Sequence, residues 1–166
     1  MIDVCSRTLG VFIDAEKVDA EFASPSLAAL DAYGDITMKR AYADWGSPES
    51  QSWSRELARH AIAPMQQNEF SAGRHSDPTA MVIHALDLHH AGILSVFAIV
   101  CDDDSYTPVA TRLRAAGAHV IGIGGPGVSS PFAEACDDYF DLEELHAERA
   151  AGRTALAAAS MGLRSA

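Results

Sequence analysis

Short apolar runs that alternate with helical patterns constrain the fold of this chain more than any other feature. Three of them, residues 8–15, 93–101 and 118–125, are almost continuously apolar and rich in β-branched residues. Strands of this kind are typical of a parallel sheet that is covered by helices on both faces. The sequence therefore predicts an α/β protein, a three-layer α/β/α fold of Rossmann-like alternation around a mainly parallel central sheet.

Glycine, proline and capping residues mark where the other elements begin and end. We expect a helix at 24–34, with Ser24 as its N-cap, Pro25 at the first helical position and Gly34 as its end. Further strands are expected at 35–45 and 64–70. The remaining helices are expected at 47–63, 77–92 and 106–117, and the segment 130–145 should contain a helix and an edge strand.

A chain of 166 residues is long enough for one domain with its own core. We expect a domain over residues 1–146 and an Ala-rich, helical tail over 147–166. The apolar face of the tail, at 154–163, fits packing against the domain or against a second copy of the chain. A homo-oligomer is therefore one expectation, and a monomer with a packed tail is the other.

Charge and cysteine content restrict the partners and the compartment. The chain has 12 basic and 23 acidic residues, a net charge of −11. Proteins that bind nucleic acid by neutralising phosphates are usually basic on at least one face, so the composition argues against tight nonspecific binding of RNA or DNA. Three cysteines without metal-ligand spacing, no leader pattern and no apolar run near the ~20 residues of a membrane span predict a cytoplasmic protein without a membrane partner.

Carboxylates follow two of the predicted strands at the edge where ligands bind. Asp14 ends the first strand, and Asp102, Asp103 and Asp104 follow the strand at 93–101. The carboxyl ends of parallel strands share one edge of the sheet. Asp14, Asp103 and a helix acid would be enough to hold Mg²⁺ or Mn²⁺, which prefer oxygen ligands and activate water. Helix capping or exposure to solvent explains the same acids equally well.

The helix at 77–92 carries two more candidate site residues. Asp77 and His84 are seven residues apart, which places them nearly on one helix face. Asp77 precedes Pro78, so it is a candidate N-cap as well as a candidate ligand. His84 could be a nitrogen ligand or a general base near neutral pH, or it could pack on the helix face with its nitrogens hydrogen-bonded.

Several blocks of the chain, which together span residues 8–145 in order, include "GVFIDAEKVD", "YGDITMKRAYADWGSP", "SDPTAMVIHALDL" and "CDDDSYTPVATRLRAAGAHVIGIG". These blocks resemble the NYN domain, a PIN-like α/β fold, in its bacterial LabA-like branch. The resemblance implies a metal-dependent endoribonuclease whose substrate is RNA. It also implies that Asp14, Asp77 and Asp103 bind Mg²⁺ or Mn²⁺ at the carboxyl edge of the sheet.

The sequence departs from the family pattern where that chemistry would occur. The first block of the family usually reads Ile-Asp-x-x-Asn, and Lys17 stands at the Asn position. The helix block of the family usually carries a second Asp seven residues after its first, and His84 stands at that position here. The block that usually reads Ser-x-Asp-Ser-Asp-Phe is here residues 101–106, in which Asp103 is kept and Ser105 replaces the second Asp. A Lys17 ammonium turned inward would pair with the acids and replace the charge of a metal ion; turned outward, it would lie at the tip of the loop.

Three functions therefore remain open from the sequence. The first is a ribonuclease with Mg²⁺ or Mn²⁺ at Asp14, Asp77 and Asp103. The second is a degenerate domain without catalysis that binds a protein partner, a nucleotide or RNA. The third is an altered enzyme in which Lys17, His84 and the remaining acids act on a small molecule.

Overall fold

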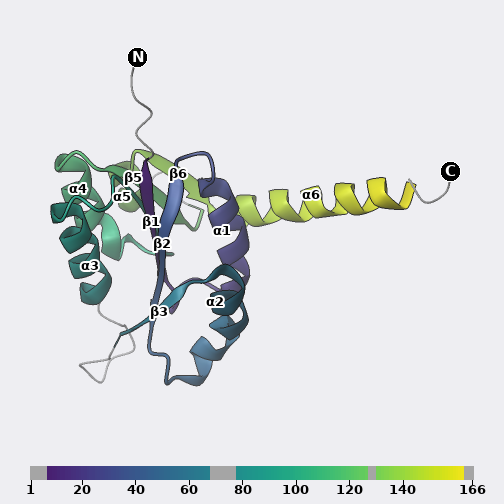
Figure 1. Cartoon of the computed structure of the whole chain (residues 1–166), viewed down its shortest axis with the longest axis horizontal. Helices are drawn as coiled ribbons and strands as arrows, with labels where there is room; N and C mark the ends of the chain where they lie inside the picture. The colour runs from purple at the N-terminus through teal and green to yellow at the C-terminus, as the bar shows by residue number, and fades with distance from the viewer. Residues whose placement is uncertain (1–6, 68–77, 127–129, 163–166) are drawn as a thin grey trace, which may run out of the picture.

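The computed structural model describes residues 7–67, 78–126 and 130–162. In these residues a central parallel sheet is covered by helices on both faces (Figure 1), which confirms the predicted α/β class and three-layer arrangement. The strands are β1 (Thr8–Asp14), β2 (Asp35–Ala43), β3 (Ala63–Gln66), β4 (Val96–Val100), β5 (His119–Gly124) and β6 (Asp138–Asp141).

The strand order places the first strand in the middle of the sheet. The sheet has six strands in the order β3-β2-β1-β4-β5-β6, and every pair of neighbouring strands is parallel. The chain runs outward from β1 in one direction and then restarts at β4 on its other side. This reversal is a topological switch point, and ligands of open α/β sheets bind beyond the carboxyl ends of the strands that flank it.

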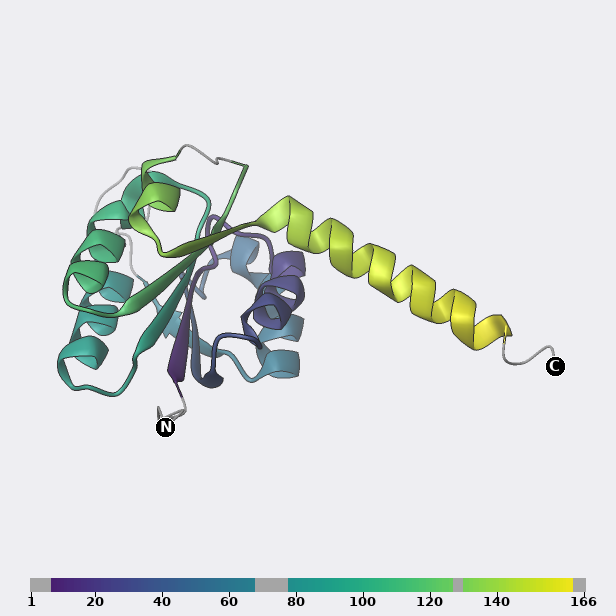
Figure 2. The same cartoon turned by 90° about the horizontal axis from the view of Figure 1, so that it is seen from above.

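Helices are divided between the two faces of the sheet. One face carries α1 and α2, and the other carries α3, α4 and α5, as the two buried clusters show. A long helix, α6, begins against the first face and then projects from the body of the molecule (Figure 2). The helices are α1 (Ala23–Leu30), α2 (Ser54–His60), α3 (Thr79–His90), α4 (Thr107–Ala115), α5 (Pro131–Ala135) and α6 (Leu142–Gly162).

Alternation along β1 determines which way its last residue points. Val11 and Ile13 belong to the cluster under α1 and α2, whereas Phe12 belongs to the cluster under α3, α4 and α5. Successive side chains of a strand point to opposite faces. Asp14 therefore projects to the α3–α5 face, at the carboxyl edge of the sheet.

Three details of the predicted helices were wrong, and the first is that α1 ends at Leu30 and not at Gly34. Ser24 is not the N-cap of α1: a 3₁₀ turn, Ala20–Phe22, leads directly into the helix, and Phe22 occupies the cap position without a side-chain bond. The segment 47–63 is not one helix but a 3₁₀ helix, Pro48–Trp53, followed by α2. The indole N–H of Trp53 donates to the Val18 carbonyl at 3.2 Å and anchors the point where the two join.

Candidate functional site

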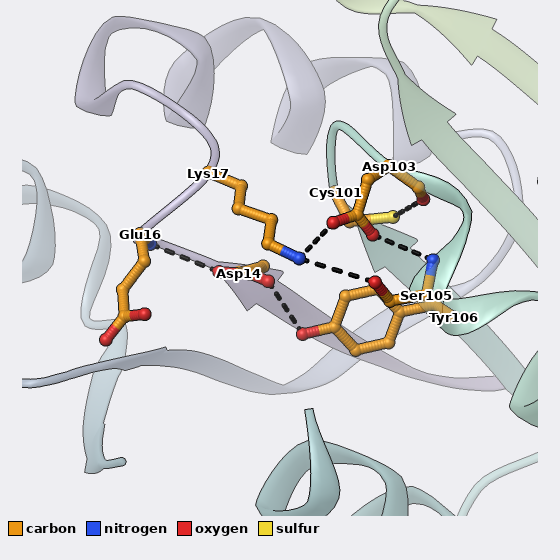
Figure 3. Close-up of polar contacts among 7 residues, drawn as sticks. All are labelled: Asp14, Glu16, Lys17, Cys101, Asp103, Ser105 and Tyr106. Atoms are coloured by element: carbon orange, nitrogen blue, oxygen red, sulfur yellow. Dashed lines mark hydrogen bonds and ion pairs between the residues drawn. The ribbon is translucent and has the colours of Figure 1, made fainter. Parts of the chain in front are cut away.

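A buried carboxylate ends β1 and receives two hydrogen bonds. Asp14 is 1% exposed. Its Oδ2 accepts a bond from the hydroxyl of Tyr106 at 2.8 Å, and its Oδ1 accepts one from the backbone N–H of Glu16 at 3.2 Å (Figure 3). Burial raises the pKa of Asp14, although the Tyr106 bond and the charge of Lys17 oppose that rise. Burial and the nearby carboxylate also raise the pKa of Tyr106, so its hydroxyl stays protonated as the donor.

An ion pair joins the loops that follow β1 and β4. The Lys17 ammonium donates to Oδ2 of Asp103 and lies 3.4 Å from the Ser105 hydroxyl. Figure 3 shows Lys17 Nζ pointing into the space between the Asp14 and Asp103 carboxylates. Of the two orientations that the sequence left open, the structure has the inward one.

Local backbone geometry holds both partners of this ion pair in place. A turn closes directly after β1, because the backbone N–H groups of Lys17 and Val18 both donate to the Asp14 carbonyl, at 3.3 and 3.0 Å. On the other side, Asp103 caps a 3₁₀ turn, Asp104–Tyr106, by accepting from the Ser105 N–H at 2.8 Å. Because β1 and β4 are neighbours in the sheet, the two turns face one another.

The contacts of Asp103 keep it ionised. Partial burial acts to raise the pKa of Asp103, but the bonds from Lys17 and Ser105 outweigh it, and the pKa is lowered. Asp103 is thus a carboxylate with a fixed cationic partner. The two acids of the site differ: Asp14 is buried and bonded to a phenol, and Asp103 is charged and bonded to an ammonium.

Neither neighbour of Asp103 takes part in the contact with Lys17. Oδ1 of Asp104 accepts from the backbone N–H of Phe132 at 3.1 Å, at the start of α5. The Asp102 carboxylate occupies the position that a Cβ at Gly125 would need. These acids line a pocket of about 190 Å³ beside the site, together with Cys101, Pro126, Ser130 and Tyr139.

His84 lies on the same face of the sheet but has a different partner. Its Nδ1 is 3.0 Å from the hydroxyl of Tyr42, a β2 residue that is in register with Asp14. Burial raises the pKa of Tyr42 to about 12, so this hydroxyl is protonated at neutral pH. Within the described residues, no hydrogen bond connects His84 to Asp14, Lys17 or Asp103.

The described residues do not fit a divalent metal ion in this arrangement. Asp77 lies outside the described residues. Among those that are described, no group of three or more His, Cys, Asp or Glu side chains is placed to hold a metal ion. Of the proposed ligands, Asp103 is occupied by the Lys17 ammonium, and one oxygen of Asp14 by the Tyr106 hydroxyl. The site therefore contains its own cation.

Tyr106 is a site residue that sequence reasoning missed. It stands where the family block that the sequence resembles usually has Phe, so a hydroxyl at an otherwise apolar position was the available signal. The structure buries its side chain completely and directs the hydroxyl at Asp14.

Comparison with known proteins identifies the family and supports the fold. The NYN domain model matches residues 8–143. A crystal structure of a protein of unknown function from Vibrio parahaemolyticus is similar, with a TM-score of 0.69 and 13% sequence identity; the likeness covers 85% of this chain and 96% of that one. None of the curated proteins matches the sequence significantly. In the described part of the chain, no helix has the length and apolar character that crossing a membrane requires.

Proposed function

Since this chain belongs to the NYN domain family, which groups with the PIN-like nucleases, we propose that it binds RNA or nucleotide phosphates without metal-dependent cleavage. The proposal depends on one observation. The Lys17 ammonium donates a hydrogen bond to the Asp103 carboxylate at the switch point of the sheet. A positive charge that belongs to the chain takes the place that a divalent ion would need.

Coulombic repulsion works against adding a metal ion to this arrangement. A divalent cation that entered between Asp14 and Asp103 would meet the fixed ammonium at short range. The interaction of charges a few ångströms apart in a partly buried site amounts to several kcal/mol. Metal binding at Asp103 would also have to displace the Lys17 ammonium from that carboxylate.

The same ammonium is a suitable contact for a phosphate. A lysine ammonium has three N–H donors, and in the described part of the chain Asp103 and Ser105 take two of them. The side chain is 20% exposed, so a ligand can reach the third. Charge-assisted bonds from lysine to phosphate oxygens are among the stronger hydrogen bonds of proteins. Lys17 is therefore the contact whose removal should weaken phosphate binding.

A metal-dependent ribonuclease is the second candidate function. The observation that favours it is the convergence of Asp14 and Asp103 from neighbouring strands on one edge of the sheet. In this alternative, Asp14, Asp77 and Asp103 hold Mg²⁺ or Mn²⁺ after Lys17 has left Asp103.

A single assay distinguishes the two candidates. A labelled single-stranded RNA is incubated with the wild-type protein in Mn²⁺ or in EDTA, and both binding and cleavage are followed. We expect binding in EDTA, no cleavage in Mn²⁺, and a loss of binding in Lys17→Ala. Lys39→Ala, which changes the other lysine of the chain, is the matched control and should bind normally. Cleavage that requires Mn²⁺ and is lost in Asp14→Ala and Asp103→Ala would establish the second candidate instead.

A further inference from the structure

A pocket on the α1–α2 face of the sheet gathers basic side chains. Its volume is about 300 Å³, at the lower end of the range for small-molecule sites. Its basic residues come from three different elements: Lys39 from β2, His60 from the end of α2 and Arg149 from α6. The other lining residues are Ser24, Leu27, Ala28, Asp31 and Ile36. The pocket therefore concentrates positive charge in a chain whose net charge is −11.

The register of β2 directs Lys39 to this face and away from the Lys17 site. Lys39 is paired with Val11 of β1, and side chains in register on neighbouring strands point to the same face. Val11 belongs to the buried cluster under α1 and α2, whereas Asp14 projects to the α3–α5 face. A position under helices is usually apolar, as at Ala41, the next residue of β2 on this face. Lys39 is thus a cation at an otherwise apolar position, where it lines the pocket.

No carboxylate neutralises Lys39 or Arg149 within the described part of the chain. Neither side chain forms an ion pair there, and water that solvates them leaves their charges in place. Both residues are half-buried, so salt screens them less than it screens fully exposed charges. His60 differs, because its Nε2 lies 3.2 Å from a carboxylate oxygen of Glu56. Two cations of the pocket are therefore available to an anion.

We propose that this pocket binds a small phosphate monoester, at a site separate from that of Lys17. An ammonium binds phosphate as a compact charge, and a guanidinium binds two phosphate oxygens at once. The volume leaves space beside the phosphate for a small organic group, which Leu27 and Ile36 would contact. Asp31 disfavours further negative charge, and so favours one phosphate group over a polyphosphate. The inference goes beyond the proposed function and does not depend on it.

Calorimetric titration with ribose 5-phosphate at low salt tests the site. We expect saturable binding by wild type, and a loss of affinity of about 10- to 100-fold in Lys39→Met and in Arg149→Met, because each removes a charged hydrogen-bond donor. Asp31→Asn should bind about 2- to 5-fold more tightly, because a negative charge near the phosphate is removed. Arg55→Met is the matched control and should bind like wild type, since Arg55 is an exposed residue of α2 that does not line the pocket.

Two lysines separate this site from the proposed function. Lys17→Ala should bind ribose 5-phosphate like wild type, and Lys39→Met should bind single-stranded RNA like wild type, because Lys39 points away from the Lys17 site. A failure of RNA binding at Lys17 would thus leave the monoester site intact. A failure of ribose 5-phosphate binding would equally leave the proposed function intact.

The inference is overturned if wild type shows no saturable binding of ribose 5-phosphate, if Lys39→Met or Arg149→Met leaves that binding unchanged, or if Lys17→Ala abolishes it. RNA binding that Lys39→Met and Arg149→Met weaken would assign the pocket to nucleic acid and would also overturn it. Inorganic phosphate that binds as tightly as ribose 5-phosphate supports the two cations as the site and free phosphate as the ligand. Should Lys39→Met fail to fold, Arg149→Met, on a separate element, must still lose affinity.

Discussion

The Lys17 ammonium donates a hydrogen bond to the Asp103 carboxylate across the carboxyl ends of β1 and β4. The two residues are far apart in the sequence and meet at the topological switch point of the sheet. Together with the Tyr106 hydroxyl on Asp14, this ion pair turns an acidic edge into a site whose two carboxylates already have partners.

Removing the ammonium should create affinity for a divalent cation. Lys17→Asn introduces the residue type that the first block of the family usually has at this position. It also leaves Asp103 without its cationic partner. We expect the affinity for Mn²⁺ to rise by about tenfold or more, because one positive charge a few ångströms from the ion has gone. Calorimetric titration measures the change. Lys39→Asn is the control, and an equal affinity in both variants would refute the role given to Lys17.

The stability of the protein should fall as Asp14 ionises, which is opposite to the usual effect of a carboxyl group. The folded-state pKa of Asp14 is raised above the ordinary value of 3.8. Above pH 3.8 and up to its folded pKa, the native state holds more protons at this residue than the unfolded state, so stability contributed by Asp14 falls as pH rises. We expect Asp14→Asn to gain stability relative to wild type over that window, as measured by Tm against pH. A constant difference across the window would contradict the buried position of Asp14.

Asp103 should show the opposite dependence on pH. Its folded pKa is lowered, so the unfolded state holds more protons below pH 3.8, and stability contributed by Asp103 is lost as pH falls through the folded pKa. Asp103→Asn should therefore be less stable than wild type at neutral pH and approach it in acid. Urea denaturation at several pH values measures this convergence, and a gap that widens in acid would be inconsistent with the ion pair.

Removal of the Tyr106 hydroxyl should leave Asp14 with one bond fewer in a buried position. Tyr106→Phe is expected to destabilise the protein by about 1–3 kcal/mol, the range for a buried polar group that loses a hydrogen-bond partner. Tyr139→Phe is the matched control, since Tyr139 donates to the Gly125 carbonyl at 2.8 Å and so loses a neutral bond. Chemical denaturation of both variants measures how much each one loses in free energy of unfolding. A smaller loss in Tyr106→Phe than in Tyr139→Phe would contradict the Asp14 carboxyl as a stronger acceptor than the Gly125 carbonyl.

His84 should matter for stability and not for ligand binding. Its ring is bonded to the Tyr42 hydroxyl, so His84→Ala removes one hydrogen bond and we expect a loss of about 1 kcal/mol. RNA binding should stay within about twofold of wild type, because no bond links His84 to Lys17 or Asp103 among the described residues. A large loss of binding without a loss of stability would place His84 in the ligand site.

The sequence predicted the fold well because the information for it is local and repeated. The apolar runs at β1, β4 and β5 are buried along nearly their whole length, and a sheet covered on both faces requires such strands. The convergence of Asp14 and Asp103 followed from the rule that parallel strands end at one edge. Helix starts were less predictable: Ser24 has the residue type of an N-cap, but a preceding 3₁₀ turn moved the start of α1.

The contacts of the site were harder to predict because they depend on how side chains orient. Whether Lys17 points inward is decided by a turn that two N–H groups form on the Asp14 carbonyl. The bond of Tyr106 to Asp14 depends on the burial of a phenol that sequence periodicity describes only as apolar.

Calorimetric titration of the wild-type protein with Mn²⁺ tests the central claim most directly. If the Lys17 ammonium occupies the cation position, the titration gives no saturable binding at this site, and Lys17→Asn acquires it. Saturable binding of one Mn²⁺ by wild type, lost in Asp14→Ala and in Asp103→Ala, would contradict the claim.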